Sequence, residues 1–284
     1  MHSQHRKQSG ILYIVATPIG NLEDITLRAI RILGEVDVIA AEDTRHTRKL
    51  LSHLAISKPL VSYYKEKEAS RAEQIINRLK QGEKVALVSD AGTPGISDPG
   101  HIIIRQALEA AIRVVPIPGP SALTAALSVA GLTNNEFLFL GFLPSKSNDR
   151  KKLLSSLLYT PYPIIFYESP HRFSASLKDC CKVLGDRQVF WARELTKLYE
   201  EMQRSTLARL VKSVHALKIR GESVLIIAGA TQNEKIPTED IEELLVWYKA
   251  NSALSLKDAV QRVTTDLGLS RSAVYKKALS IWKQ

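Results

Sequence analysis

Three loops rich in glycine and proline carry the residues best suited to bind a ligand. The first follows an apolar run that ends at Val88 and reads Ser89-Asp-Ala-Gly-Thr-Pro-Gly-Ile-Ser-Asp-Pro-Gly100. Glycine lets the backbone approach a ligand closely, and proline stiffens the loop. Open α/β sheets bind small molecules at the carboxyl ends of their strands. We therefore expect Asp90 and Thr93 to contact a ligand, although Asp is also common in turns and helix caps.

Two other apolar runs end in the same kind of loop. One runs into Thr17-Pro-Ile-Gly-Asn21, and the other runs into Pro118-Gly-Pro-Ser-Ala122. None of the three loops matches GxGxxG or a P-loop. If the strands are parallel, all three loops face one crevice. There we expect Ile19 to cover an apolar face of the ligand, and Ser121 and Ala122 to contact it.

The elements that position these loops alternate between strand and helix along the first half of the chain. Such alternation is typical of parallel βαβ units. We expect strands near residues 11–16, 36–41, 59–63, 84–89 and 113–117, and a helix over 121–130 that is capped by Gly131. A break at residues 131–135 precedes a second set, with strands expected at 137–142, 163–167, 189–192 and 223–228 and helices at 148–159, 171–184 and 206–218.

The C-terminal segment differs from both sets. Thr238 precedes a capped helix, and a helix over 255–267, a turn at Gly268 and a basic helix over 270–282 follow. This pattern fits a helix-turn-helix that binds nucleic acid through Arg271, Lys276 and Lys277. The alternative is a helical hairpin docked on the core through a buried stripe of Ala259, Val263, Val274 and Leu279. The predicted domains are therefore a loose 1–10 and three folded parts at 11–132, 133–233 and 237–284.

Composition limits the possible functions. Hydrophobic residues make up 45% and charged residues 24% of the 284, which is typical of a globular protein. The adjacent cysteines, Cys180 and Cys181, and the scattered histidines lack metal-ligand spacing, so we expect no metal. No apolar run is long enough for a membrane span, and we expect a soluble, cytoplasmic protein. The net charge is +10, with 16 basic and 14 acidic residues before residue 140 but 15 and 8 over 140–229, which favours a polyanionic partner.

Six motifs in order carry a family resemblance. They are Ala16-Thr-Pro-Ile-Gly-Asn-Leu22, Ala41-Glu-Asp-Thr-Arg-His-Thr47, Ser89-Asp-Ala-Gly-Thr-Pro94, Ser97-Asp-Pro-Gly100, Pro118-Gly-Pro120 and Tyr167-Glu-Ser-Pro-His-Arg172. From about residue 11 to its end, the chain resembles the bacterial small-subunit (16S) ribosomal RNA methyltransferases that modify a cytidine ribose 2′-hydroxyl, within the tetrapyrrole methylase superfamily. Ala16 and Gly95 depart from the pattern of these relatives.

The resemblance implies two α/β domains of the tetrapyrrole methylase type, with S-adenosylmethionine bound between them and a helical extension. It implies that Tyr167, Leu195 and Thr196 contact the donor. It also implies that the protein is a homodimer and that its partner is ribosomal RNA or the small ribosomal subunit. Asp43 and Glu168 are the candidate proton acceptors or substrate orienters, and Arg45, Arg172, Arg193 and Lys197 suit phosphates. Structural ion pairs are the competing explanation for each. A tetrapyrrole or diphthine-type methyltransferase and a non-catalytic nucleic-acid-binding protein stay open as alternatives.

Overall fold

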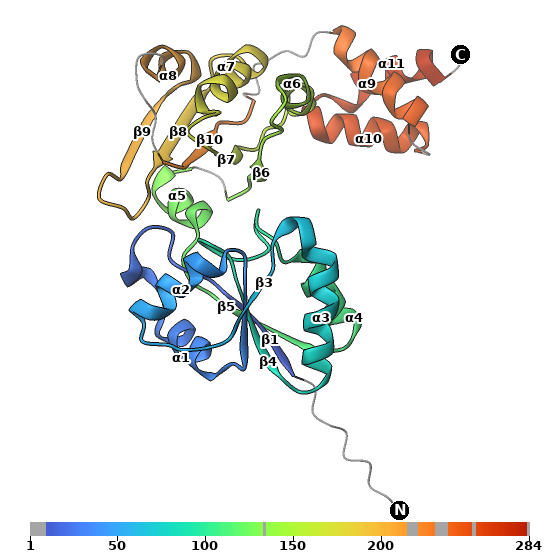
Figure 1. Ribbon diagram of the computed structural model, residues 1–284. Coiled ribbons are helices and arrows are strands. Elements are labelled where there is room, and N and C mark those ends of the chain that lie inside the picture. The colour runs from blue at the N-terminus through green and yellow to red at the C-terminus, as the bar shows by residue number, and fades with distance from the viewer. Residues whose placement is uncertain (1–9, 133–134, 215–220, 231–237, 252–253, 283–284) are drawn as a thin grey trace, which may run out of the picture. The chain divides into compact units, whose positions relative to one another are not determined.

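The computed structural model describes residues 10–132, 135–214, 221–230, 238–251 and 254–282, which are divided between two compact units (Figure 1). The first unit runs to Gly131 and also includes Ala192–Glu201. The second unit comprises Leu132–Trp191 and Met202–Gln284. The predicted boundary at 132/133 adjoins residues 133–134, and the one at 233/237 falls within residues 231–237. Both of these segments lie outside the described residues, as does nearly all of the predicted loose 1–10.

The first unit is built on a parallel sheet, as predicted. Its strand order is β3-β2-β4-β1-β5. Every strand pair of this sheet is parallel, so all the carboxyl ends lie along one edge. Because β4, β1 and β5 are neighbours, the three loops that follow them leave the sheet side by side. The strands are β1 Ile11–Val15, β2 Val38–Ala41, β3 Leu60–Ser62, β4 Lys84–Val88 and β5 Arg113–Ile117.

Helices cover both faces of this sheet (Figure 1). On one face, α1 Leu27–Glu35 and α2 Thr44–His53 bury apolar side chains against the strands. On the other, α3 Glu68–Lys80 and α4 His101–Glu109 do the same. Helix α5 Ala122–Ala130 ends at Gly131, whose φ of 56° is the left-handed cap that the sequence predicted. Two 3-10 turns, η1 Leu22–Asp24 and η2 Lys65–Lys67, complete the unit.

The second unit contains a mixed sheet of order β6-β7-β10-β8-β9, in which β10 and β7 are antiparallel. Three helices pack on this sheet through one apolar cluster, and they are α6 Ser147–Ser156, α7 Phe173–Leu184 and α8 Leu207–Val214. Part of the predicted helix 206–218 extends into residues 215–220, outside the described chain. The strands are β6 Leu138–Phe142, β7 Ile164–Glu168, β8 Gln188–Arg193, β9 Glu201–Thr206 and β10 Ser223–Ile227.

Strand β9 was missed by the sequence analysis. It lies at the edge of the sheet. Half-buried and exposed residues alternate over its first four positions, and none of its residues is buried. Its sequence, Glu-Met-Gln-Arg-Ser-Thr, contains one apolar residue, so it lacks the apolar run by which the buried strands were recognised. A polar edge strand is held by its neighbour's backbone rather than by burial.

The C-terminal helices pack on one another as a cluster of three. They are α9 Thr238–Asn251, α10 Leu256–Leu267 and α11 Arg271–Trp282, and all three contribute to one buried cluster. Of the predicted stripe, Ala259, Val263 and Val274 are fully buried, whereas Leu279 is half-buried. The side chain of Thr238, the predicted cap, lies outside the described residues. None of the helices described here combines the length and apolar character needed to cross a bilayer.

Candidate functional site

The three glycine- and proline-rich loops of the first unit meet at Gly92. The amide of Thr17 donates to the Gly92 carbonyl at 2.8 Å, and the Gly92 amide donates back at 3.0 Å. The hydroxyl of Thr93 donates to the carbonyl of Pro120 at 3.2 Å. Gly92 has a φ of +80°, and a Cβ there would lie 3.6 Å from the Ile19 side chain. Ile19, Thr93 and the loop before Ser121 are therefore brought together, as the sequence predicted.

Small residues allow the first and third loops to approach each other. A Cβ on Gly119 would lie 3.0 Å from the Cβ of Ala16, so a side chain at residue 119 would require the loops to shift by a few tenths of an ångström. Ser121 occupies the N-cap position of α5 without capping it through its side chain, and Ala122 is the first residue of that helix. Both are half-buried.

Glu68 anchors the far end of the 89–100 loop. It is 4% exposed, and its Oε1 accepts hydrogen bonds from the Gly100 amide at 2.9 Å and the Tyr63 hydroxyl at 3.1 Å. The same oxygen lies 3.4 Å from the amide of Ile102. Burial of Tyr63 beside this carboxylate raises the pKa of its phenol above the usual value. Sequence reasoning missed Glu68, because no local spacing links it to Gly100.

Three carboxylates lie at the carboxyl edge of β2 and β4. Asp90 Oδ1 accepts from the Asp43 amide at 2.9 Å, and the Asp90 amide approaches Glu42 Oε2 at 3.4 Å. Burial raises the pKa of Glu42, and the Asp90 carboxylate adds to the rise, whereas the hydrogen bond from the Asp90 amide opposes it. Hydrogen bonds from the side chain and backbone of Arg45 lower the pKa of Asp43 to about 2. Asp43 is thus a carboxylate at any physiological pH.

A small cavity of about 160 Å³ opens beside Asp90. It combines one carboxylate with the cationic Lys49, a histidine and a few apolar side chains. Its lining residues are Thr17, Pro18, Leu22, His46, Lys49, Leu50 and Asp90. His46 and Lys49 were not among the predicted ligand contacts, although their spacing with Leu50 places all three on one side of α2.

The loop between β8 and β9 also belongs to the first unit and contacts Gly20. A Cβ on Gly20 would collide with the Lys197 side chain and lie 3.1 Å from the Leu195 carbonyl. Thr196 has a φ of 66°, and its buried hydroxyl has no hydrogen-bond partner in the described chain. Lys197 forms an ion pair with Glu194 at 2.7 Å, so its charge is compensated locally.

Other predicted phosphate-binding residues also have carboxylate partners. Arg193 Nε lies 2.7 Å from Glu201, Arg45 Nη2 lies 2.9 Å from Asp43, and Lys277 Nζ lies 2.8 Å from Glu242. Arg271 and Lys276 are exposed.

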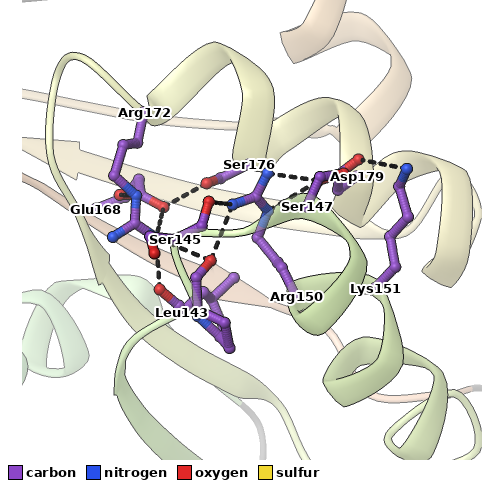
Figure 2. Close-up of polar contacts among 10 residues, drawn as sticks. Leu143, Ser145, Ser147, Arg150, Lys151, Glu168, Arg172, Ser176 and Asp179 are labelled. Carbon is purple, nitrogen blue, oxygen red and sulfur yellow. Dashed lines mark hydrogen bonds and ion pairs between the residues drawn. The ribbon is translucent and has the colours of Figure 1, made fainter.

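In the second unit, Glu168 is fully buried and holds the segment that follows β6 (Figure 2). Its oxygens accept from the Ser169 amide at 2.9 Å and from the Ser176 hydroxyl, and they form an ion pair with Arg172. Arg172 in turn donates to the carbonyls of Leu143 and Pro144. The Glu168 side chain does not face solvent, and the Arg172 side chain is only 31% exposed, so this arrangement suits a positioning role.

A second arginine, which is buried, completes the network in Figure 2. Arg150, with its side chain 3% exposed, donates to the carbonyls of Pro144 and Ser145 at 2.9 and 3.1 Å. Its Nε also donates to Asp179 at 2.9 Å, and Asp179 accepts from Ser147 at the same distance. Two arginines thus fix three consecutive carbonyls just before α6.

Tyr167 lies next to this network on β7. Its ring makes edge contacts with Phe139 and Phe142, with centroids 5.1 and 5.6 Å apart. Nowhere in the described part of the chain do three or more His, Cys, Asp or Glu side chains gather as metal ligands would.

Comparisons with known proteins agree with this geometry. The model of the protein family described as "Tetrapyrrole (Corrin/Porphyrin) Methylases" matches residues 11–211. A relative from Escherichia coli O157:H7, named ribosomal RNA small subunit methyltransferase I, is 44% identical over 282 residues, 98% of each chain. A relative of the same name from Halalkalibacterium halodurans is 43% identical over 283 residues, 96% of each chain.

Solved structures share the fold at lower identity. Uroporphyrin-III C-methyltransferase from Thermus thermophilus, in complex with S-adenosylhomocysteine, is 19% identical with a TM-score of 0.55, over 77% of this chain and 97% of that one. Diphthine synthase is 16% identical with a TM-score of 0.59, over 78% and 91%. The α/β fold class and the resemblance inferred from the six motifs are both confirmed, and the chain belongs to the tetrapyrrole methylase family.

Proposed function

We propose that this protein transfers a methyl group from S-adenosylmethionine to the ribose 2′-hydroxyl of a cytidine in small-subunit ribosomal RNA. One observation carries the proposal: the three glycine- and proline-rich loops meet at Gly92, beside Asp90, in a chain of this family. The donor supplies a methyl group already activated on a sulfonium. The protein therefore has to bind the donor, orient the hydroxyl and exclude water.

The first unit offers groups of the right chemistry for the donor. Asp90 and its neighbouring carboxylates suit a ligand that carries a sulfonium, an ammonium and ribose hydroxyls. Ile19 supplies an apolar face, and Thr93, Ser121 and Ala122 supply polar backbone and hydroxyl groups around it. The unpartnered buried hydroxyl of Thr196 is a further observation that fits a bound polar ligand. The contacts of Tyr167 and Leu195 with the donor stay predictions.

Asp43 and Glu168 stay predictions as proton acceptors. With a pKa of about 2, Asp43 is a weak base, so it suits a role in orienting the ribose hydroxyl better than one in removing its proton. Glu168 is buried among three donors, so we assign it the positioning of the segment from Leu143 to Ser145. The variant Glu168→Gln separates the two roles for Glu168: a general base predicts loss of kcat, whereas a positioning residue predicts lower thermal stability with the pH profile kept.

The choice of RNA over a tetrapyrrole or a protein substrate follows from the near full-length relatives. Those at 43 and 44% identity are named for small-subunit ribosomal RNA, whereas the uroporphyrin-III and diphthine enzymes match at 19 and 16%. Mapping ribose methylation of ribosomal RNA in cells with and without the protein tests this choice. An unchanged map, together with activity on a tetrapyrrole, would support the alternative substrate.

Asp90→Ala tests the donor site. We expect calorimetry to show at least tenfold weaker binding of S-adenosylmethionine, which is about 1.4 kcal/mol and typical of a lost hydrogen bond to a charged group. Asp37→Ala is the matched control, because Asp37 also accepts a backbone hydrogen bond, from Lys84 at 2.7 Å, but at the amino edge of the same sheet. Equal donor affinity in the two variants would contradict the role of Asp90.

A homodimer and a cytoplasmic location also belong to this proposal. Sedimentation of the purified protein tests the first, and fractionation of cells tests the second.

A further inference from the structure

One side of α2 carries a stripe of basic residues. Arg45, Arg48, Lys49 and His53 recur at spacings that place them on one face of the helix. All four are exposed, whereas Thr47, Leu50 and Leu51 of the same helix are buried. The helix Thr44–His53 contains no Asp or Glu, so its exposed face carries no negatively charged side chain of its own.

Two of the three Lys and Arg side chains of this stripe have no counter-charge among the described residues. Arg45 forms an ion pair with Asp43, but no described carboxylate lies within ion-pair distance of Arg48 or Lys49. Elsewhere in the first unit, Arg31, Arg78 and Arg105 each pair with a glutamate. Holding like charges together without counter-charges is unfavourable unless a polyanion supplies them.

The stripe is continuous with the cavity beside Asp90. Lys49 belongs to both, because it lies on the exposed face of α2 and also lines the cavity with His46 and Leu50. A chain of phosphates that lay along the stripe would therefore pass the mouth of the cavity, next to the loops that are proposed to hold the donor.

We infer that the α2 face formed by Arg45, Arg48 and Lys49 binds the phosphate backbone of the RNA that flanks the target nucleotide. This inference rests on the proposed function, and it names the surface by which the substrate is positioned. Phosphate contacts fix the register of a nucleic acid without reading its sequence. Arg48 and Lys49 are thus positioning residues, and their removal affects substrate binding more than the turnover of bound substrate.

The double variant Arg48→Gln, Lys49→Gln tests the inference, with Lys84→Gln, Arg113→Gln as its control. The control removes one lysine and one arginine that are also exposed but lie at the amino ends of β4 and β5, at the opposite edge of the sheet. The substrate is the small ribosomal subunit purified from cells that lack this protein. Methylation kinetics and subunit binding are measured at several salt concentrations.

We expect the KM for subunits to rise at least tenfold in the α2 variant while kcat changes little, and the control to behave as wild type. The slope of log affinity against log salt concentration falls by about 1.4 to 1.8 for two lost phosphate contacts. KM and salt slope equal to those of the control would overturn the inference. Lower donor affinity in the single variant Arg48→Gln would overturn it as well, since Arg48 does not line the cavity. A wild-type protein that leaves the subunits unmethylated would instead overturn the proposed function.

Discussion

Replacing Glu68 by Ala removes the acceptor that fixes the end of the 89–100 loop. The carboxylate is 4% exposed, and it accepts hydrogen bonds from the Gly100 amide at 2.9 Å and from the hydroxyl of Tyr63, which is fully buried, at 3.1 Å. In the variant both donors stay in the protein interior without an acceptor. The hydroxyl of Tyr63, which also accepts from the Ile103 amide at 3.3 Å, loses its fixed orientation.

The size of the effect follows from these contacts. A buried donor left without an acceptor costs about 1–3 kcal/mol, so two donors predict a loss of about 3 kcal/mol of stability. For a protein of this size, each kcal/mol lowers the melting temperature by about 2–4 °C. We therefore expect Glu68→Ala to melt about 6–12 °C below wild type. Glu68→Gln keeps an acceptor oxygen, and we expect it to lose about 1 kcal/mol.

Calorimetry of three variants measures the effect and its consequence for the donor loop. Glu73→Ala is the control, because Glu73 is an exposed glutamate on the same helix. Below its melting temperature, Glu68→Ala should also bind S-adenosylmethionine at least threefold more weakly, because the loop that carries Asp90 and Thr93 is no longer held at Gly100.

Two results would contradict this reasoning. If Glu68→Ala melts within about 2 °C of Glu73→Ala, the hydrogen bonds of Glu68 do not stabilise the fold as argued. If it melts lower but binds the donor as wild type does, the anchored end of the loop has no part in donor binding.

Two further variants test the charged groups. Asp179→Ala leaves Arg150 buried without its carboxylate, and we expect a loss of about 3–5 kcal/mol in chemical denaturation. Arg45→Ala should return the pKa of Asp43 from about 2 towards 3.8, as followed by NMR titration. Because folding lowers this pKa, ionised Asp43 stabilises the wild-type fold above pH 3.8 and loses that contribution as the pH falls towards 2. The variant keeps the backbone hydrogen bonds to Asp43 but not those of the guanidinium, so it should show a smaller loss.

The donor loops and the parallel sheet could be predicted because their signals are local in the sequence. An apolar run followed by Gly and Pro marks the end of a buried strand, and parallel pairing then places the loops at one edge. Ile19, Asp90 and Thr93 therefore lay near one another, as expected. Gly131 was recognised as a cap because a left-handed residue after a helix is a local requirement.

The residues that hold the 89–100 loop and the segment after β6 in place could not be predicted, because their partners lie far along the chain. Glu68 contacts Gly100 and Arg172 contacts Leu143 only in the folded protein, and no spacing of residues along the sequence predicts either contact. The net charge counted by segment also failed to predict the basic face of α2. The first half of the chain is nearly neutral overall, because acidic residues on its other elements balance the basic residues of α2.

The contact between Gly20 and residues 195–197 has a consequence for the synthesis of the chain. The first unit is not a continuous stretch of sequence, since it includes Ala192–Glu201, which runs from the end of β8 to the first residue of β9. The loop after β1 thus obtains its packing neighbour about 175 residues after it has been translated, which is a delay of roughly 10–35 s at ordinary elongation rates. Newly made donor loops stay incomplete during that interval. Ligand binding by the nascent chain is therefore expected to appear only after Glu201 has left the ribosome.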